Sequence, residues 1–248
     1  MTNTETHSRA VNTLVSVKEG ANPKVVEMFD RIAGTYDKLN RFFSMGVDRT
    51  WRKQAVRSLV LQPGMRVLDC SAGTGDMSFE AHKQCAGVHT TLFDPSAKML
   101  ELAETKARNT SITNYDLLCG AAEQISAEDA SYDRFMVAFG IRNFHDLSGG
   151  LTELHRVLKP GGMGVILEFT PDRSKIIDKI FKFYMWWVMR PVGGAVSDDR
   201  EAYKYLAETI QKFPSSDKLI EIFKQAGFSR VEAVPLSLGI ATRFILTK

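Results

Sequence analysis

Hydrophobic positions follow two different periods along most of the chain, and the two periods alternate. Short apolar runs bounded by turn residues predict strands at Arg66–Cys70, Val88–Phe93, Tyr115–Cys119, Phe135–Phe139 and Gly164–Phe169. Stretches of helical periodicity predict helices at Asp76–Gln84, Ser96–Arg108 and Leu147–Leu158, the last ended by Lys159-Pro160-Gly161-Gly162. Strands and helices that alternate at this spacing predict βαβ crossovers, and therefore a parallel sheet in an α/β fold.

The segments on either side of this alternation have other patterns. Residues 1–22 are polar and lack periodicity, which predicts a flexible tail. Residues 23–61 have helical periodicity, so we expect a helical cover outside the sheet; its apolar face comprises Val25, Val26, Phe29, Ile32 and Tyr36. Residues 174–211 are a predicted helical insertion. The chain then continues with a predicted helix at Ser216–Ala226 and two β-rich stretches, Arg230–Leu236 and Ile240–Leu246.

Composition restricts the classes of protein to consider. A chain of 248 residues is consistent with one α/β domain, which we place at residues 23–248. The formal net charge of +3 is too small to indicate a nucleic-acid partner, although it leaves peripheral contact with an anionic membrane surface open. The three cysteines have no metal-ligand spacing, and we expect no metal. With no secretory signal, transit peptide or spanning segment, we expect a cytoplasmic protein or one at the inner membrane face.

A glycine-rich turn follows the first predicted strand and opens a helix. Gly73 and Gly75 allow the backbone to bend sharply and to approach a ligand closely. In an open parallel sheet, this turn lies at the carboxyl ends of the strands, where ligands bind. Asp94 ends the next strand, 19 residues after Gly75, where a carboxylate can accept hydrogen bonds from both hydroxyls of a ribose. Because Asp94 stands at this spacing, a turn that only connects a strand to a helix is the less favoured interpretation.

The residues around the turn distinguish two nucleoside cofactors. A dinucleotide site has a third glycine, and the corresponding residue is Ser78. Asp69 and Asp76 flank the turn, and their negative charge disfavours a pyrophosphate but suits the positive S-adenosylmethionine (SAM). We therefore favour SAM. After the third strand, the small residues Ala121 and Ala122 would let an adenine lie against the backbone.

Four further stretches resemble a known family. They are Tyr36-Asp37-Lys38-Leu39-Asn40 with Ser44 and Trp51, Phe139-Gly140-Ile141-Arg142-Asn143, Arg156–Gly162, and Tyr203–Ile210. From about Val25 onwards, the chain resembles the demethylmenaquinone/ubiquinone C-methyltransferase family; the third stretch is shared with many class I methyltransferases. The resemblance implies a Rossmann-like class I methyltransferase fold, with a mostly parallel seven-stranded sheet, helices on both faces and an antiparallel last strand.

The resemblance also implies a set of site residues. It places SAM contacts on Thr74, Asp94, Ala121 and Ala122, to which we add Asp69, Gly73, Gly75 and Ala138. Three positions depart from the family's usual residues, because Ala121 stands where Asn is common, Ala138 where Ser is frequent and Asp48 where His is usual.

The implied reaction is methylation of a ring carbon of a reduced polyprenyl quinone, which needs an electron-rich ring. Arg142 is our candidate to stabilise an oxyanion or to orient a water, Asn143 to bind a quinol oxygen, and Tyr36 to close over the site. The structural alternatives are an ion pair or helix cap for Arg142 and Asn143, and core packing for Tyr36. Demethylmenaquinol is the acceptor we favour over a ubiquinone precursor.

Other interpretations stay open at this point. The acceptor could be another small molecule, or the protein could bind SAM or NAD without catalysis. A nucleic-acid methyltransferase is disfavoured, because Phe139–Asn143 has neither a proline-rich nor a cysteine nucleophile motif. The aromatic run Phe181–Trp187 could line a channel for an isoprenoid tail or contact lipid; we favour burial of these residues in the core.

Overall fold

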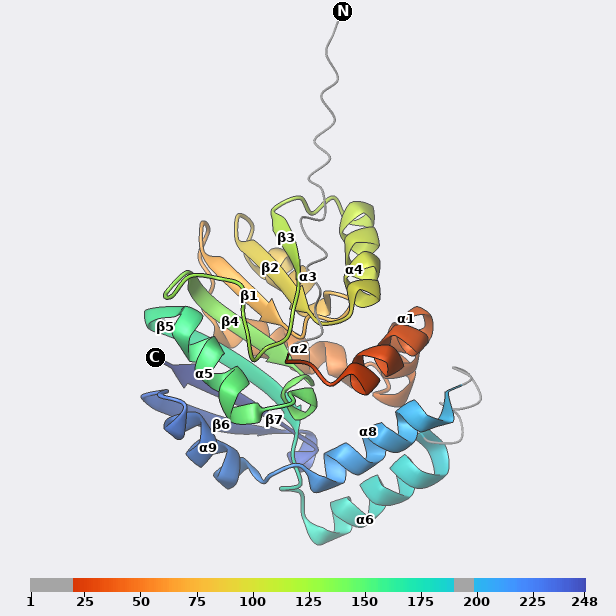
Figure 1. Ribbon diagram of the computed structural model, residues 1–248. Coiled ribbons are helices and arrows are strands. Elements are labelled where there is room, and N and C mark those ends of the chain that lie inside the picture. Colours follow the sequence, from red (N-terminus) through yellow and green to blue (C-terminus); the bar gives the residue numbers. More distant parts are fainter. Residues whose placement is uncertain (1–19, 190–198) are drawn as a thin grey trace, which may run out of the picture.

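One seven-stranded sheet forms the centre of the molecule. The structure is a computed structural model that describes residues 20–189 and 199–248 (Figure 1). The strands lie in the order β3-β2-β1-β4-β5-β7-β6. Their bounds are β1 Arg66–Cys70, β2 His89–Asp94, β3 Tyr115–Cys119, β4 Tyr132–Ala138, β5 Leu158–Phe169, β6 Arg230–Leu236 and β7 Ala241–Thr247. The first five strands pair in parallel, and β7 pairs antiparallel with both β5 and β6. Strand order reverses between β1 and β4, so the sheet's ligand-binding crevice is expected at their carboxyl ends.

Helices cover both faces of this sheet. One face packs against α2 (Val47–Ser58), α3 (Asp76–Gln84) and α4 (Ala97–Asn109), and the other against α5 (Leu147–Val157) and α9 (Ser216–Gln225). On the α5/α9 face, Phe135 and Phe244 are fully buried against helix residues such as Phe223. Burial of apolar side chains on both faces supplies the main driving force for folding and explains the continuous apolar runs of the parallel strands.

Three more helices form a layer at the carboxyl ends of the strands. They are α1 (Pro23–Phe43), α6 (Lys175–Tyr184), which continues as the π-helical turn Met185–Met189, and α8 (Arg200–Lys212) (Figure 1). Met28 and Ile32 of α1 pack with Ala202 of α8 in a small cluster separate from the sheet core. Arg31 Nε donates to Asp199 Oδ2 at 2.7 Å, which also joins α1 to the start of α8.

The two helices of the segment 23–61 lie differently. Helix α1 lies in the outer layer, whereas α2 packs on a face of the sheet, with Trp51 and Val56 buried in a cluster that includes strand residues. One expectation in this region is wrong. The aromatic run was expected in the core, yet Phe183, Trp186 and Trp187 are 63%, 40% and 72% exposed. The reason is that α6 lies in the outer helical layer and not against the sheet, so one side of it faces away from the core.

Most element bounds agree with the sequence prediction to within a residue or two. The fifth strand is the main exception, because β5 begins at Leu158 and includes Lys159–Gly162, predicted only as a stop. A register shift between Tyr132 and Arg134 accommodates this early start. Residues 1–19 of the predicted tail and 190–198 of the predicted insertion lie outside the described residues.

Candidate active site

The glycine-rich turn is held open by a buried carboxylate. Asp94 Oδ2 accepts from the amide of Gly73 at 2.8 Å, and Oδ1 accepts from the amide of Ser96 at 2.8 Å. Gly75 has φ 84°, and a Cβ there would lie 2.9 Å from side-chain atoms, so the position requires glycine. Among the residues that the structure describes, a Cβ on Gly73 would meet no atom within 4 Å. Asp94 therefore fixes the backbone of the turn, and the described residues leave room for a ligand where a Cβ of Gly73 would point.

Two carboxyl groups at this turn have raised pKa values. Burial raises the pKa of Asp94 to about 6 and that of Asp69 to about 7. Asp69 accepts from both the amide and the hydroxyl of Ser78, at 3.0 and 2.8 Å, and thereby ties β1 to α3. Its carboxyl is 1% exposed, so its predicted contribution to cofactor binding would act through the position of the turn.

Helix α1 is joined to the turn by polar contacts. The hydroxyl of Thr74 donates to Asp37 Oδ1 at 2.6 Å, and Lys106 Nζ donates to that hydroxyl at 2.8 Å. Lys106 also pairs with Asp37, and with Asp76 at 3.1 Å. Thr74 thus sits under α1, beside two carboxylates and two cations, since Arg41 also lies 3.9 Å from Asp76.

The remaining predicted cofactor residues lie after β3 and at the end of β4, at the same edge of the sheet. Ala121 and Ala122 are buried and Ala138 is half-buried. A Cβ on Gly120 would lie 2.5 Å from the ring of Phe93, which keeps the backbone close to β2. Their contact with a cofactor stays a prediction.

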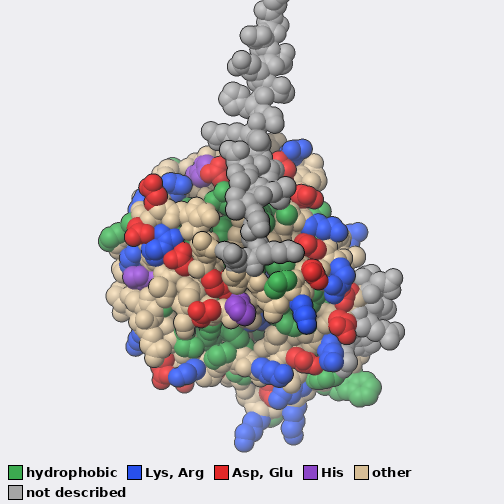
Figure 2. All heavy atoms as spheres, in the orientation of Figure 1, with side chains coloured by type: hydrophobic (Ala, Val, Ile, Leu, Met, Phe, Trp, Pro, Cys, Tyr) green, Lys and Arg blue, Asp and Glu red, His purple; other side chains and the backbone are tan. Residues whose placement is uncertain are grey.

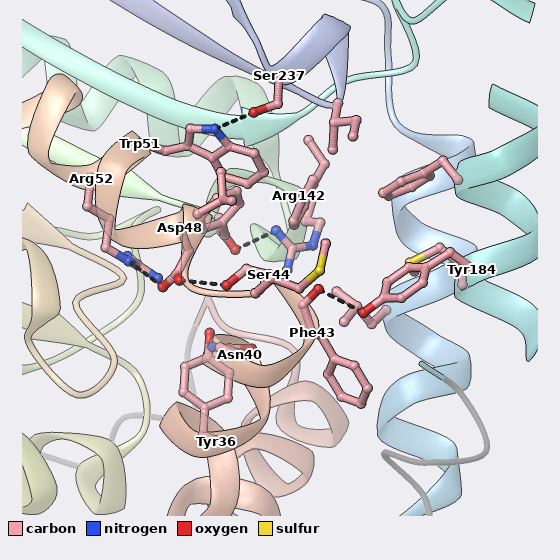
Figure 3. Close-up of a pocket in the computed structure, with 18 of the residues that line it drawn as sticks. Tyr36, Asn40, Phe43, Ser44, Asp48, Trp51, Arg52, Arg142, Tyr184 and Ser237 are labelled. Atoms are coloured by element: carbon pink, nitrogen blue, oxygen red, sulfur yellow. Dashed lines mark hydrogen bonds and ion pairs between the residues drawn. The ribbon is translucent and has the colours of Figure 1, made fainter. Parts of the chain in front are cut away.

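A cavity of about 440 Å³ opens beside this edge, under α1, α6 and α8. Its wall is mostly aliphatic and aromatic, with contributions from Ile32, Phe43, Trp51, Phe139, Phe169, Phe181, Met185 and Leu206. Polar groups are few, and Figure 3 shows Arg142 among them, between residues of α1 and α2 on one side and Tyr184 on the other. The shape and composition suit one large, mainly apolar ligand.

Arg142 is anchored by a carboxylate that sequence reasoning missed. Its Nη1 donates to Glu168 Oε1 at 2.7 Å and to the carbonyl of Phe139 at 2.6 Å. The two side chains are 5% and 0% exposed. Burial raises the pKa of Glu168, and the Arg142 guanidinium opposes this. In the described part of the chain, Arg142 Nε has no hydrogen-bond partner. The expected alternative of an ion pair is thus present, while the Arg142 side chain also lines the cavity.

The other two predicted catalytic residues differ in position. Tyr36 lines the cavity, and burial raises the pKa of its hydroxyl. It also packs edge-on against Phe29, at 6.0 Å between ring centroids, so the core-packing interpretation holds beside the functional one. Asn143 is not among the residues of the cavity wall. Its Oδ1 accepts a hydrogen bond of 3.1 Å from the hydroxyl of Tyr205, and Tyr205 does line the cavity.

A second carboxylate lies in the wall itself. Asp48 is 5% exposed, and its Oδ1 accepts from the hydroxyl of Ser44 at 2.6 Å. Its Oδ2 is 3.7 Å from Arg52 Nε, and both contacts are visible in Figure 3. In the sequence, Asp48 stood out only as a departure from the family pattern. The signal for Glu168 was a charged residue inside an apolar strand.

Solved structures with this fold include SAM-dependent methyltransferases. One from Thermotoga maritima, described as a possible histamine N-methyltransferase, gives a TM-score of 0.64 at 20% identity, covering 90% of this chain and 98% of that one. Another from Aquifex aeolicus gives 0.57 at 19% identity, with 79% and 88% covered. The class I methyltransferase fold expected from the sequence is confirmed.

Sequence comparison then gives the family. The model of the ubiE/COQ5 methyltransferase family matches residues 16–248, and the chain belongs to this family. The Geotalea daltonii protein named ubiquinone/menaquinone biosynthesis C-methyltransferase UbiE is 41% identical over 221 residues, 88% of this chain and 94% of that protein. The demethylmenaquinone methyltransferase of Deinococcus radiodurans is 38% identical over 233 residues, 93% and 95% of the two chains.

The described residues contain neither a membrane-spanning helix nor a cluster of metal ligands. Within residues 20–189 and 199–248, no helix has the length and apolar character needed to cross a bilayer. Over the same ranges, no three His, Cys, Asp or Glu side chains group in a way that could hold a metal ion.

Proposed function

We propose that the protein transfers a methyl group from SAM to a ring carbon of a reduced polyprenyl quinone, with demethylmenaquinol as acceptor and a ubiquinone precursor as the alternative. The observation that carries this proposal is the large apolar cavity beside the glycine-rich turn, with Arg142 buried in its wall. The relatives' names support the same chemistry. A quinol ring with an isoprenoid tail is mainly apolar and carries two oxygens, which matches a wall with few polar groups.

The residues at the turn fit SAM. Gly73 leaves its upper side free, Asp94 is a buried carboxylate at the end of β2, and Ala121 and Ala122 are small and buried. Asp37 accepts a hydrogen bond from the Thr74 hydroxyl, and a carboxylate beside the turn suits a cation better than a pyrophosphate. We expect these residues to hold the ribose, adenine and amino-acid part of SAM. When bound, SAM supplies an electrophilic methyl group on a positively charged sulfur.

Arg142 has the geometry of an oxyanion ligand. Glu168 fixes one edge of the guanidinium, and the Arg142 side chain lies in the cavity wall. A permanent cation in an apolar wall favours the ionised form of a ring hydroxyl, whose pKa is about 10 in the tyrosine model. The developing phenolate then makes the adjacent ring carbon nucleophilic.

Asp48 is our candidate for the proton acceptor. It is buried in the wall, oriented by Ser44 and close to the positive charge of Arg52. The hydroxyl proton passes to Asp48 Oδ2 as the ring carbon forms its bond to the methyl group. The methylated carbon then loses its hydrogen as a proton to water, and the oxygen regains the proton from Asp48. The net product is one proton in solution, the methylated quinol and S-adenosylhomocysteine.

The test follows label from SAM into quinol. Purified protein is incubated with methyl-labelled SAM and either reduced or oxidised demethylmenaquinone. We expect label in the quinol only, because the quinone ring is electron-poor. Absence of label from the quinol, with SAM bound, would overturn the choice of acceptor, and absence of SAM binding would overturn the proposed function as a whole.

The role of Asp48 has its own matched pair of variants. Asp48→Asn keeps the size and the bond from Ser44 but cannot accept the proton, so we expect kcat to fall about 100-fold or more. Asp48→His restores a base of a different pKa, so activity should return with a shifted pH profile. Full activity of Asp48→Asn, with an unchanged pH profile, would exclude Asp48 as the base.

A further inference from the structure

Helix α6 and the turn after it carry three separate rows of side chains. The inner row lines the cavity and comprises Ile177, Phe181 and Tyr184. The outer apolar row comprises Ile176, Ile180, Phe183 and Trp187, which are 73%, 60%, 63% and 72% exposed. The basic row comprises Lys175, Lys179 and Lys182. Each row follows three- and four-residue steps, so each occupies its own side of the helix. An apolar row with this much exposure indicates contact with an apolar partner.

The outer apolar row is continuous with the opening of the cavity. Ile180, Met45 and Leu238 line the cavity, yet they are 60%, 84% and 76% exposed. Residues that are both lining and exposed mark the rim of an opening. These three come from α6, from the turn after α1 and from the 3-10 turn between β6 and β7. The rim is therefore apolar, and it leads directly into an apolar interior.

We propose that the rim and the outer apolar row dock on an anionic lipid bilayer, so that the isoprenoid tail of the acceptor passes from the bilayer into the cavity. This inference rests on the proposed function, since only an acceptor dissolved in lipid needs such an entrance. Apolar side chains at this position would enter the boundary between headgroups and acyl chains, with the basic row at the level of the phosphates.

Charge distinguishes a bilayer from a second copy of the chain. Asp178, the one acidic residue of α6, pairs with Lys182 at 2.7 Å and with Arg173 at 3.0 Å. Lys175 and Lys179 make no ion pair with any residue the structure describes. Figure 2 shows basic side chains projecting from the lower edge of the molecule, where α6 lies in Figure 1. Two copies joined through this helix would bring their basic rows together, whereas anionic lipid neutralises them.

The experiment measures vesicle binding and two activities of the full chain. The triple variant Ile176→Ser/Phe183→Ser/Trp187→Ser changes only residues outside the cavity wall. Val60→Ser is the control, because Val60 is 64% exposed and lies before β1, at the opposite end of the strands. Flotation uses vesicles of phosphatidylcholine with and without phosphatidylglycerol. Activity is measured on a short-tailed quinol in solution and on a long-tailed quinol embedded in the vesicles.

We expect the triple variant to lose flotation and vesicle activity but to retain activity on the soluble quinol, and Val60→Ser to match the wild type. Lys175→Gln/Lys179→Gln should weaken binding to the anionic vesicles about 25-fold, near fivefold for each lysine. Flotation of the triple variant like the wild type would overturn the proposal. A wild-type dimer that the triple variant dissociates, without vesicle binding, would also overturn it. Wild-type flotation without methylation of either quinol would instead count against the proposed function.

Discussion

The ion pair of Arg142 and Glu168 allows catalysis and stability to be separated. Arg142→Ala leaves Glu168, which is 0% exposed, without its cation. Loss of one partner of a buried pair costs about 3–5 kcal/mol of folding free energy, because the other charge stays uncompensated. The same variant loses the cation at the reacting ring, which we expect to lower kcat about 100- to 1,000-fold. Arg142→Ala alone therefore cannot distinguish the two effects.

The double variant Arg142→Met/Glu168→Gln resolves this. It removes both charges and approximately keeps the volume, so the free energy of unfolding should return to within about 1 kcal/mol of the wild type. The quinol has still lost its oxyanion ligand, so kcat should remain low. Chemical denaturation measures the first quantity, labelled methyl transfer the second, and SAM titration is the control. A double variant that regains full activity would refute a direct role of Arg142 in the reaction.

Three further predictions concern the surrounding structure. Burial raises the pKa of Asp69 from its ordinary value of 3.8 to about 7, so the free energy of unfolding falls as pH rises between these values. In urea titrations at several pH values, Asp69→Asn should remove at most about 4 kcal/mol of this fall. Gly164→Ala places a Cβ 2.1 Å from the ring of Phe135 and should lower the free energy of unfolding by about 3 kcal/mol or more. Its control, Gly34→Ala, lies at an exposed helix position with no described atom within 4 Å and should raise that free energy by about 1 kcal/mol. Equal shifts of the two melting temperatures would contradict this. Lys106→Met removes the cation between α1 and the glycine-rich turn, so hydrogen exchange of α1 amides should accelerate about tenfold; unchanged exchange would mean that apolar packing alone holds α1.

The fold could be predicted from the sequence because its signals are local. Period, turn residues and the stop after α5 define the elements, and alternation alone implies a parallel sheet. The packing of α2 on the sheet could not be predicted from local sequence signals. An apolar face on a helix is equally compatible with a cover and with a sheet face, and only the three-dimensional packing of Trp51 decides between them.

The site was predictable to a smaller extent. The glycine-rich turn and Asp94 are adjacent through sheet topology, which the sequence implies. The cavity is built by α1 with α2, by residues after β4 and by α6 with α8, and these three parts are far apart in the chain, so no single motif contains its residues. For the same reason, nothing in the sequence paired Arg142 with Glu168, 26 residues later, or brought Asp48 to the same wall. The exposure of Trp187 likewise depends on the position of α6 in the outer helical layer, which no local sequence signal encodes.

The order of the last two strands has a consequence for how the chain folds. β6 precedes β7 in sequence, but β7 lies between β5 and β6, and β6 pairs with no other strand in the described structure. β6 therefore cannot join the sheet before β7 has formed. The two strands must first associate as an antiparallel hairpin and then attach to β5 together, or β7 must add first. Until then, β5 presents a long unpaired apolar edge, which is the point where an incompletely folded chain is most prone to aggregate.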